Sequence, residues 1–250
     1  GSVEGVIATK TELYEWLRTH GGTAFVNGDD GLLMGKSEGM DRETYGTGAG
    51  VDLRGKAKAS GTPFLHMEIE AADKSKPWPV ETRLIGDYNA PNVLAAIGIG
   101  RHFHIADQVM ADAIGHYAPA NSRSQFKDTG RNELVLDAYN ANPTSMAAAL
   151  ENFAKLPSDR KKLVILGDMR ELGDTSRTEH AAIVHLVQEL GLDAILVGNE
   201  FMKAAPEVPV RRFVGVTAAA EALKVDKPID LLILVKGSRG IKLEEVVVVL

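Results

Sequence analysis

The second half of the chain, from residue 131 onward, alternates short uninterrupted apolar runs with longer amphipathic segments. A short apolar run without polar interruption is typical of a strand buried on both faces, and such strands joined by helices form a parallel sheet. We expect strands at 133–137, 162–166, 194–197, 211–214 and 231–235, and helices at 144–155, 176–190, 200–205, 218–224 and 243–250. The pattern predicts a Rossmann-like, mostly parallel, doubly wound α/β domain.

The first 120 residues are less regular. We expect a helix at 9–19, a strand at 23–27, a glycine-rich irregular stretch at 32–50, extended segments at 51–59 and 62–71 that form a hairpin about Ser60-Gly61, and helices at 89–103 and 106–117. A cluster of turn-forming residues at 119–122 separates these segments from the regular repeat. The chain is therefore predicted to have two domains, 1–120 and 121–250.

Composition excludes several classes of protein. The 250 residues include no cysteine, so disulfides, thiolate metal sites and cysteine nucleophiles are excluded. The net charge of −6 argues against a nucleic-acid-binding protein that neutralises phosphates. The sequence has no apolar run of the roughly 18 residues that a membrane span needs, and its start does not resemble a signal peptide. A soluble, cytoplasmic protein without nucleic-acid or membrane partners is expected.

Two glycine-rich segments imitate phosphate-binding loops. Gly31–Ser37 follows a predicted strand but has three residues between its glycines where the phosphate loop needs four, so we expect a surface turn there. Gly46–Gly50 does not fit the dinucleotide-binding spacing and is expected to be a loop. The histidines are scattered and form no HExxH motif, which leaves no convincing zinc site.

The segment that follows the first strong strand, Asp137–Pro143, is the most informative. An acidic residue at the carboxyl end of a parallel strand, followed by a polar turn and a helix, is placed where a nucleotide ribose is held. The Asp137 carboxylate can accept both ribose hydroxyls, and the Tyr139 ring can cover the base. An Asx turn that caps the next helix explains the same residues equally well.

Other polar groups also lie at helix starts and strand ends. Asn89 and Asn92 carry amides that can bond both a donor and an acceptor on adenine, although helix capping is the favoured explanation. Asp168 follows the predicted strand at 162–166, and the loop from Lys236 through Ser238 to Arg239 follows the strand at 231–235. The two cations and the hydroxyl of this loop could bind a carboxylate or phosphate, and a solvated surface loop is the alternative interpretation.

Taken together, six segments resemble those of the Mur ligase family of ATP-dependent amino-acid and peptide ligases. In order along nearly the whole chain, they are 9–13, 27–30, 88–92, 137–143, 167–173 and 236–239. The first resembles the family's lysine-bearing helix, the second its Asn-x-Asp-Asp turn and the third its adenine segment. The last three resemble the branch that adds a dipeptide rather than a single amino acid.

The resemblance implies roles for individual residues. Lys10, which spacing alone marks only as a helix-surface lysine, matches a lysine that is carbamylated in the family and then offers oxygen to Mg²⁺. The resemblance implies adenine contacts for Asn89 and Asn92, a ribose contact for Asp137, and a phosphate contact for Arg123, and Tyr139 stays a candidate nucleotide contact from its place beside Asp137. It implies that Asp168, Lys236, Ser238 and Arg239 position the acceptor dipeptide.

The implied reaction is ATP-driven joining of D-alanyl-D-alanine to a UDP-N-acetylmuramoyl-tripeptide through an acyl phosphate. ATP and Mg²⁺ are the implied cofactors, the substrates are small molecules, and a monomer is expected. In the family, the phosphate loop, a magnesium-binding glutamate and the UDP-sugar domain precede the lysine helix. The chain is therefore interpreted as a partial central ATPase domain followed by a complete C-terminal domain, and alone it is expected not to ligate.

Two alternatives stay open at this stage. The first is another ligase of the same superfamily, which adds a single amino acid or extends folate with glutamate. The second is a non-catalytic nucleotide-binding module, because the phosphate loop is outside these 250 residues.

Overall fold

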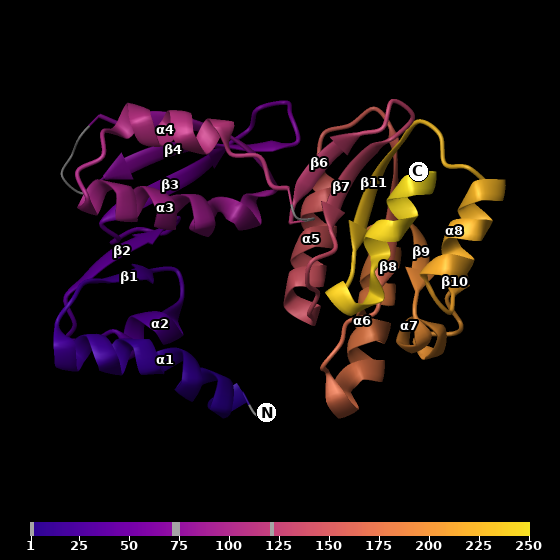
Figure 1. Cartoon of the computed structure of the whole chain (residues 1–250), viewed down its shortest axis with the longest axis horizontal. Helices are drawn as coiled ribbons and strands as arrows, with labels where there is room; N and C mark the ends of the chain where they lie inside the picture. The colour runs from indigo at the N-terminus through magenta and orange to yellow at the C-terminus, as the bar shows by residue number, and fades with distance from the viewer. Residues whose placement is uncertain (1–2, 72–75, 121–122) are drawn as a thin grey trace. The chain divides into compact units, whose positions relative to one another are not determined.

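The computed structural model describes residues 3–71, 76–120 and 123–250, which form two compact units. The first unit comprises Gly1–Ser60, Leu65–Thr82 and Asn89–Tyr117, and the second comprises Gly61–Phe64, Arg83–Tyr88 and Ala118–Leu250. Figure 1 labels the elements of each unit. No helix in the described ranges is both long enough and apolar enough to cross a membrane.

The second unit is built on a six-stranded sheet with the order β10-β9-β8-β11-β7-β6. Its strands are β6 (Gln125–Asp128), β7 (Glu133–Asp137), β8 (Lys161–Gly167), β9 (Asp193–Val197), β10 (Arg211–Phe213) and β11 (Leu231–Lys236). Only β6 is antiparallel to its neighbour; the other pairs are parallel. The last strand in sequence, β11, lies between β7 and β8, which brings the carboxyl ends of these three strands side by side. The predicted parallel α/β fold is confirmed.

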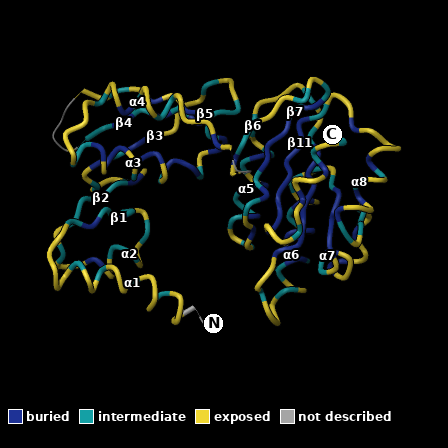
Figure 2. Tube along the Cα trace, in the orientation of Figure 1, coloured by how far each residue is buried: buried dark blue, intermediate teal, exposed yellow. Residues whose placement is uncertain are grey.

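Helices cover both faces of this sheet, as Figure 1 shows. One face packs against α5 (Pro143–Lys155), α6 (Ser176–Glu189) and α7 (Asn199–Lys203), and the other against α8 (Val216–Val225) and the 3-10 helix η4 (Leu243–Val249). Successive residues of a strand pack into the cores on opposite faces of the sheet. In β8, Val164 and Leu166 lie in the core with α5 and α6, whereas Leu163 and Ile165 lie in the core with α8 and η4. The strands β7, β8, β9 and β11 are accordingly buried over most of their length, as Figure 2 shows for β7 and β11, and this explains their uninterrupted apolar sequence.

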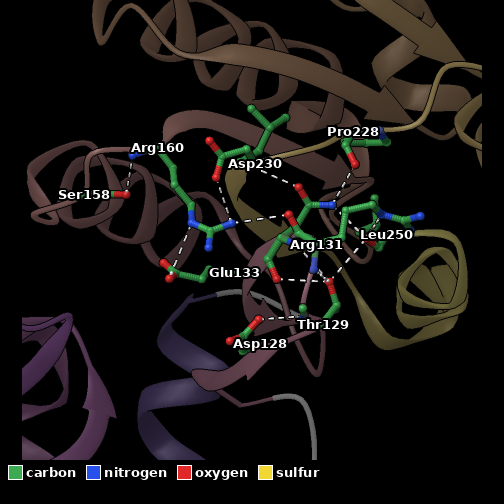
Figure 3. A network of polar contacts seen from close by, with 12 residues as sticks. Asp128, Thr129, Arg131, Glu133, Ser158, Arg160, Pro228, Asp230 and Leu250 are labelled. Carbon is green, nitrogen blue, oxygen red and sulfur yellow. Dashed lines mark hydrogen bonds and ion pairs between the residues drawn. The ribbon is translucent and has the colours of Figure 1, made fainter.

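The last residues of the chain are held by a network of polar contacts, shown in Figure 3. The fully buried Asn132 donates from Nδ2 to the carbonyl oxygens of Pro228 and Leu250, at 2.8 and 2.7 Å, and accepts from the Leu231 amide at 3.0 Å. Arg131 Nε donates to the Leu250 oxygen at 2.9 Å. The network ties η4 to the turn before β7. The predicted α-helix at 243–250 is a 3-10 helix.

The first unit has a five-stranded mixed sheet with the order β1-β2-β3-β4-β5. The strands are β1 (Ala24–Asn27), β2 (Arg42–Gly46), β3 (Leu53–Lys58), β4 (Phe64–Ala71) and β5 (Trp78–Ile85). The helices are α1 (Val3–His20), α2 (Gly31–Lys36), α3 (Ala90–His102) and α4 (Asp107–His116), and η1 (Asp87–Asn89) precedes α3. β1, β2 and β3 are parallel, and β3 and β4 form the predicted antiparallel hairpin.

Two expectations for the first unit were wrong, and two strands of the chain were missed. Residues 31–36 form α2, not a surface turn, because the Asp30 carboxylate accepts hydrogen bonds from the Leu32 and Leu33 amides and caps the helix. The stretch 32–50 is not irregular throughout, since it also contains β2, whose buried positions are Thr44 and Gly46 and give no apolar signal. The strands β5 and β6 were missed because neither forms an apolar run: β5 alternates buried residues such as Val80 and Ile85 with exposed polar ones, and β6 has no buried residue.

Candidate functional site

Two oppositely charged residues end adjacent strands of the second unit. Asp137 is the last residue of β7 and Lys236 the last of β11, and the two are paired in the strand register. Lys236 Nζ lies 2.5 Å from Asp137 Oδ2, and the Lys236 side chain is 2% exposed against 15% for Asp137. The Ser124 amide donates to Asp137 Oδ1 at 3.3 Å. An ionised carboxylate has about four acceptor positions, so Asp137 can still accept from a ligand.

Tyr139, two residues beyond Asp137, holds two guanidinium groups. Arg123 Cζ lies 3.7 Å from the centre of the Tyr139 ring, and Arg239 Cζ lies 5.3 Å from it. The hydrogen bond and charge of Arg123, with a smaller contribution from Arg239, lower the pKa of the Tyr139 phenol from its usual value of 10. The predicted site residues Arg123, Tyr139 and Arg239 therefore lie together. The guanidinium groups of Arg123 and Arg239 lie over the Tyr139 ring, at the position where the sequence analysis suggested a nucleobase.

Ser238 connects three loops at this edge of the sheet. Its amide donates to the Asp168 carbonyl at 3.2 Å, and its hydroxyl donates to the Ala141 carbonyl at 3.3 Å. The hydroxyl oxygen also accepts from the Arg170 amide at 2.9 Å. Ser238 is buried, and its hydrogen bonds fix the loops after β7, β8 and β11 relative to one another.

The Asp168 carboxylate is also buried and bound to backbone. Its two oxygens accept from the Glu200 and Phe201 amides, each at 3.0 Å, at the start of α7. A Cβ on Gly198 would lie 2.2 Å from this carboxylate, and Gly198 has a φ of +128°, so only glycine fits there. Buried His180 accepts from the Met169 amide at 3.0 Å through Nε2. Direct acceptor binding by Asp168, Lys236 and Ser238 stays a prediction.

The asparagine pair lies in the first unit. Asn92 Nδ2 donates to Asn89 Oδ1 at 3.1 Å, which orients both amides. Asn89 occupies the N-cap position of α3 but makes no side-chain cap hydrogen bond, so the favoured capping explanation is wrong. In the Asp137–Pro143 segment, by contrast, Asn142 forms a capping box with Ser145 at the start of α5, while Asp137 takes no part in the cap. Capping thus accounts for Asn142 and leaves Asp137 available.

Lys10 is an exposed residue on α1. Within residues 3–71, 76–120 and 123–250 there is no group of three or more His, Cys, Asp or Glu side chains that could hold a metal ion. A carbamate on Lys10 would supply a hard oxygen ligand, and Mg²⁺ is usually bound by one or two carboxylates together with waters and substrate phosphates. A magnesium site that includes Lys10 therefore stays a prediction.

A cavity of about 590 Å³ lies at the opposite edge of the second unit's sheet, near the first residues of β8, β9, β10 and β11. None of the predicted site residues lines it. The clustered charges and the ring contacts place the candidate site at the carboxyl edge instead, where ligands bind in open α/β sheets.

Sequence reasoning missed two groups at the carboxyl edge. Ser124, whose amide bonds Asp137, follows a segment with no apolar signal. Arg170 lies within the segment 167–173, but its relation to Ser238 and Gly240 arises only when β8 and β11 become neighbours.

Two domain models of one family match the chain. The Mur ligase middle domain matches residues 1–100, and the Mur ligase glutamate ligase domain matches residues 122–239. The chain belongs to the Mur ligase family. A Bacillus subtilis UDP-N-acetylmuramoyl-tripeptide–D-alanyl-D-alanine ligase is 29% identical over 99% of the chain.

Solved structures of Mur ligases share the fold. MurF from Acinetobacter baumannii superposes with a TM-score of 0.81 at 22% identity, over 98% of this chain and 55% of that one. MurF from Thermotoga maritima, solved in complex with ADP, superposes with a TM-score of 0.76 at 19% identity, over 91% and 52%. The chain also spans only 55% of the Bacillus relative. It is thus a partial Mur ligase.

Proposed function

We propose that the chain is the nucleotide-holding and acceptor-facing part of an ATP-dependent ligase that joins D-alanyl-D-alanine to a UDP-N-acetylmuramoyl-tripeptide in peptidoglycan synthesis. The observation that carries the proposal is the arrangement of Arg123, Tyr139 and Arg239 beside the Asp137–Lys236 pair, at the carboxyl edge of a Mur ligase sheet. The family supports ATP dependence, and the Bacillus relative supports the choice of acceptor.

In this proposal, Asp137 accepts hydrogen bonds from the ribose hydroxyls. Lys236 neutralises the partly buried carboxylate and fixes its orientation, leaving its outer lone pairs for the sugar. Asn89 and Asn92 are the adenine contacts of the first unit, and their mutual hydrogen bond fixes the orientation in which the two amides meet the base.

Arg123 binds the nucleotide phosphates in this proposal. Tyr139 holds the guanidinium against its ring, which limits the side-chain freedom that Arg123 would lose on binding. The tripeptide carboxylate attacks the γ-phosphorus of ATP, which releases ADP and forms the acyl phosphate. The dipeptide amine then attacks the acyl carbon, and the amide forms as phosphate leaves and the amine gives up a proton. Exclusion of water by the loops after β7, β8 and β11 protects the acyl phosphate.

We further propose that residues 1–120 correspond to the later part of the central domain and 121–250 to the C-terminal domain, in a monomeric, cytoplasmic protein. Mg²⁺ enters the proposal as the ion that accompanies ATP, with Lys10, as a carbamate, among its ligands. Lys10→Ala in the full-length protein should abolish most activity, and acetate should partly restore it by replacing the carbamate oxygens.

The test is ADP release by the full-length protein with ATP, Mg²⁺, the UDP-tripeptide and D-alanyl-D-alanine. Release that requires both the tripeptide and the dipeptide supports the proposal. Release with a single amino acid, or with a folate and glutamate, would assign the chain to another ligase of the superfamily. The absence of release with any acceptor would favour a nucleotide-binding module.

A further inference from the structure

The cavity of about 590 Å³ in the second unit lies where four strands of the sheet begin, at the edge opposite the candidate site. We call it the amino-edge cavity. Its volume is typical of small-molecule sites, which measure roughly 300–1,000 Å³. Most of its lining is apolar and includes the side chains of Val187, Leu192, Val208, Val210, Leu223 and Leu231. A ligand that covers this apolar surface displaces water from it, which favours binding.

The wall that precedes β10 is held by one guanidinium group. Arg212 Nη1 donates to the Val208 carbonyl at 2.9 Å, and Nη2 donates to the Ala205 carbonyl at 2.7 Å. Arg212 Nε donates to the Phe201 carbonyl at 3.2 Å. Because three carbonyls of this segment bind the same side chain, the position of Val208 in the lining is fixed.

The wall that precedes β11 is held from the other side. The buried Asn132 donates from Nδ2 to the Pro228 carbonyl at 2.8 Å and accepts from the Leu231 amide at 3.0 Å, and Figure 3 shows Pro228 in this network. An ion pair of 2.8 Å between Arg211 and Asp226 joins the start of β10 to the end of α8. The cavity is therefore preformed, and a ligand that enters it loses little affinity to the ordering of its walls.

Four charged side chains line the amino-edge cavity: Asp193, Arg211, Asp226 and Lys227. Arg211 and Asp226 neutralise each other. Asp193 and Lys227 are exposed, and neither has an ion-pair partner in the described ranges of the chain. The mouth of an apolar cavity thus carries one unpaired carboxylate and one unpaired ammonium group.

The two unpaired charges come from different loops. Asp193 begins β9 shortly after the end of α6, whose terminal carbonyls carry partial negative charge and favour a cation beside Asp193. Lys227 lies between α8 and β11 and can bond an anion. Since β8 separates β9 from β11, the two charges flank the cavity rather than pair with each other.

We propose that the amino-edge cavity binds a free amino acid with a large apolar side chain. Its ammonium group bonds Asp193, its carboxylate bonds Lys227, and its side chain packs against the apolar lining. A zwitterion compensates both unpaired charges, whereas a monocation or a monoanion leaves one of them without a partner. None of the residues assigned to the nucleotide or to the acceptor lines this cavity, so the inference goes beyond the proposed function.

The test is an NMR titration of the 250-residue chain that follows the methyl signals of Val187, Leu223 and Leu231. L-Phenylalanine is compared with phenethylamine, which keeps only the ammonium group, and with 3-phenylpropionate, which keeps only the carboxylate. Phenylalanine should shift the three signals in a saturable way, and each of the other two should bind at least about threefold more weakly because it loses one exposed ion pair.

Glycine has both charges but no apolar side chain, and it should give no saturable shift. The inference is overturned if phenylalanine gives no saturable shift, if glycine binds as well as phenylalanine, or if the three aromatic ligands bind equally.

Variants assign each end of the ligand to one residue. Asp193→Asn should weaken phenylalanine and phenethylamine about threefold and leave 3-phenylpropionate unchanged, whereas Lys227→Gln should weaken phenylalanine and 3-phenylpropionate and leave phenethylamine unchanged. Asp159→Asn and Lys155→Gln are the matched controls, because both residues are exposed and lie outside the cavity. Unaltered phenylalanine affinity in both cavity variants would refute the assignment.

Two further measurements exclude other occupants and another location. Dilution of the chain without ligand should leave the three methyl signals unshifted, and shifts that follow chain concentration would mean that a second copy fills the cavity, which overturns the inference. Excess ADP should not displace phenylalanine, because the nucleotide is proposed to bind at the opposite edge. Displacement by ADP would place the amino acid at the carboxyl edge and would also overturn the inference.

Discussion

The Lys236 ammonium lies 2.5 Å from Asp137 Oδ2, at paired positions where two parallel strands end. Burial of the Lys236 side chain, which is 2% exposed, is costly without an opposite charge beside its ammonium group, so the two side chains depend on each other. The pair gives the carboxyl edge one carboxylate of fixed orientation, to which Ser124 contributes an amide.

Replacing Lys236 by methionine should destabilise the second unit strongly. The substitution keeps the apolar stem but leaves Asp137 largely buried without its counter-charge, which costs about 3 kcal/mol of the free energy of unfolding. Denaturant unfolding measures this loss. Lys203→Met, which breaks the exposed Lys203–Glu200 pair, is the control and should cost less than about 1 kcal/mol. Equal losses in the two variants would mean that the buried pair does not hold the edge.

The pKa of Tyr139 should rise when Arg123 is replaced by methionine. The hydrogen bond and charge of Arg123 lower this pKa below 10, and the contribution of Arg239 is smaller. Ultraviolet absorbance of the phenolate, compared with that of Tyr139→Phe, isolates this one group. Arg211→Met is the control. A Tyr139 titration curve that is unchanged in Arg123→Met would show that the two side chains do not interact in solution.

The same shift makes stability depend on pH in a defined direction. A phenol whose pKa is lower in the folded than in the unfolded chain favours folding most strongly above pH 10, and this contribution disappears as the pH falls through the folded pKa. Tyr139→Phe should therefore remove a small gain in stability between the folded pKa and pH 10. Denaturant unfolding across that pH range measures the gain, and a Tyr139→Phe curve parallel to that of the unchanged chain would contradict it.

Gly198→Ala should destabilise the start of α7 more than a matched glycine substitution does. The new Cβ would lie 2.2 Å from the Asp168 carboxylate, at a φ of +128°. Gly191, at a φ of +64°, has no atom within 4 Å of the position that an alanine methyl would occupy, so Gly191→Ala measures the backbone strain alone, about 1 kcal/mol. Thermal unfolding should show a loss at least about 2 kcal/mol larger for Gly198→Ala. Equal losses would rule out the contact with Asp168.

A strand could be predicted from the sequence where its residues form an uninterrupted apolar run. Strands such as β8 and β11 are buried on both faces and therefore form continuous apolar runs. β2 buries Thr44, and β5 alternates buried with exposed residues, so neither forms such a run and both were missed. The glycines in residues 31–36 favoured the prediction of a turn. A helix, α2, forms there instead because the Asp30 side chain caps its first amides.

The strand-end rule located the candidate site but could not assign the contacts within it. It placed Asp137 and the loop from Lys236 to Arg239 after strands of a parallel sheet, at the edge where ligands bind. It could not show that Lys236 and Ser238 are buried against protein groups, or that Arg170 packs on Gly240. Those relations depend on which strands become neighbours, and β11 enters the sheet between two strands that precede it in the sequence.

The most direct test of the nucleotide site is calorimetric titration of the chain with ADP, with and without Arg123→Met. Arg123 is exposed, so its replacement leaves the fold intact. The unchanged chain should bind with a Kd near about 1 mM, equivalent to about 4 kcal/mol, and Arg123→Met should weaken binding about tenfold. Arg211→Met should bind as the unchanged chain does. Equal ADP affinity in the chain and in Arg123→Met would contradict a nucleotide site at this edge.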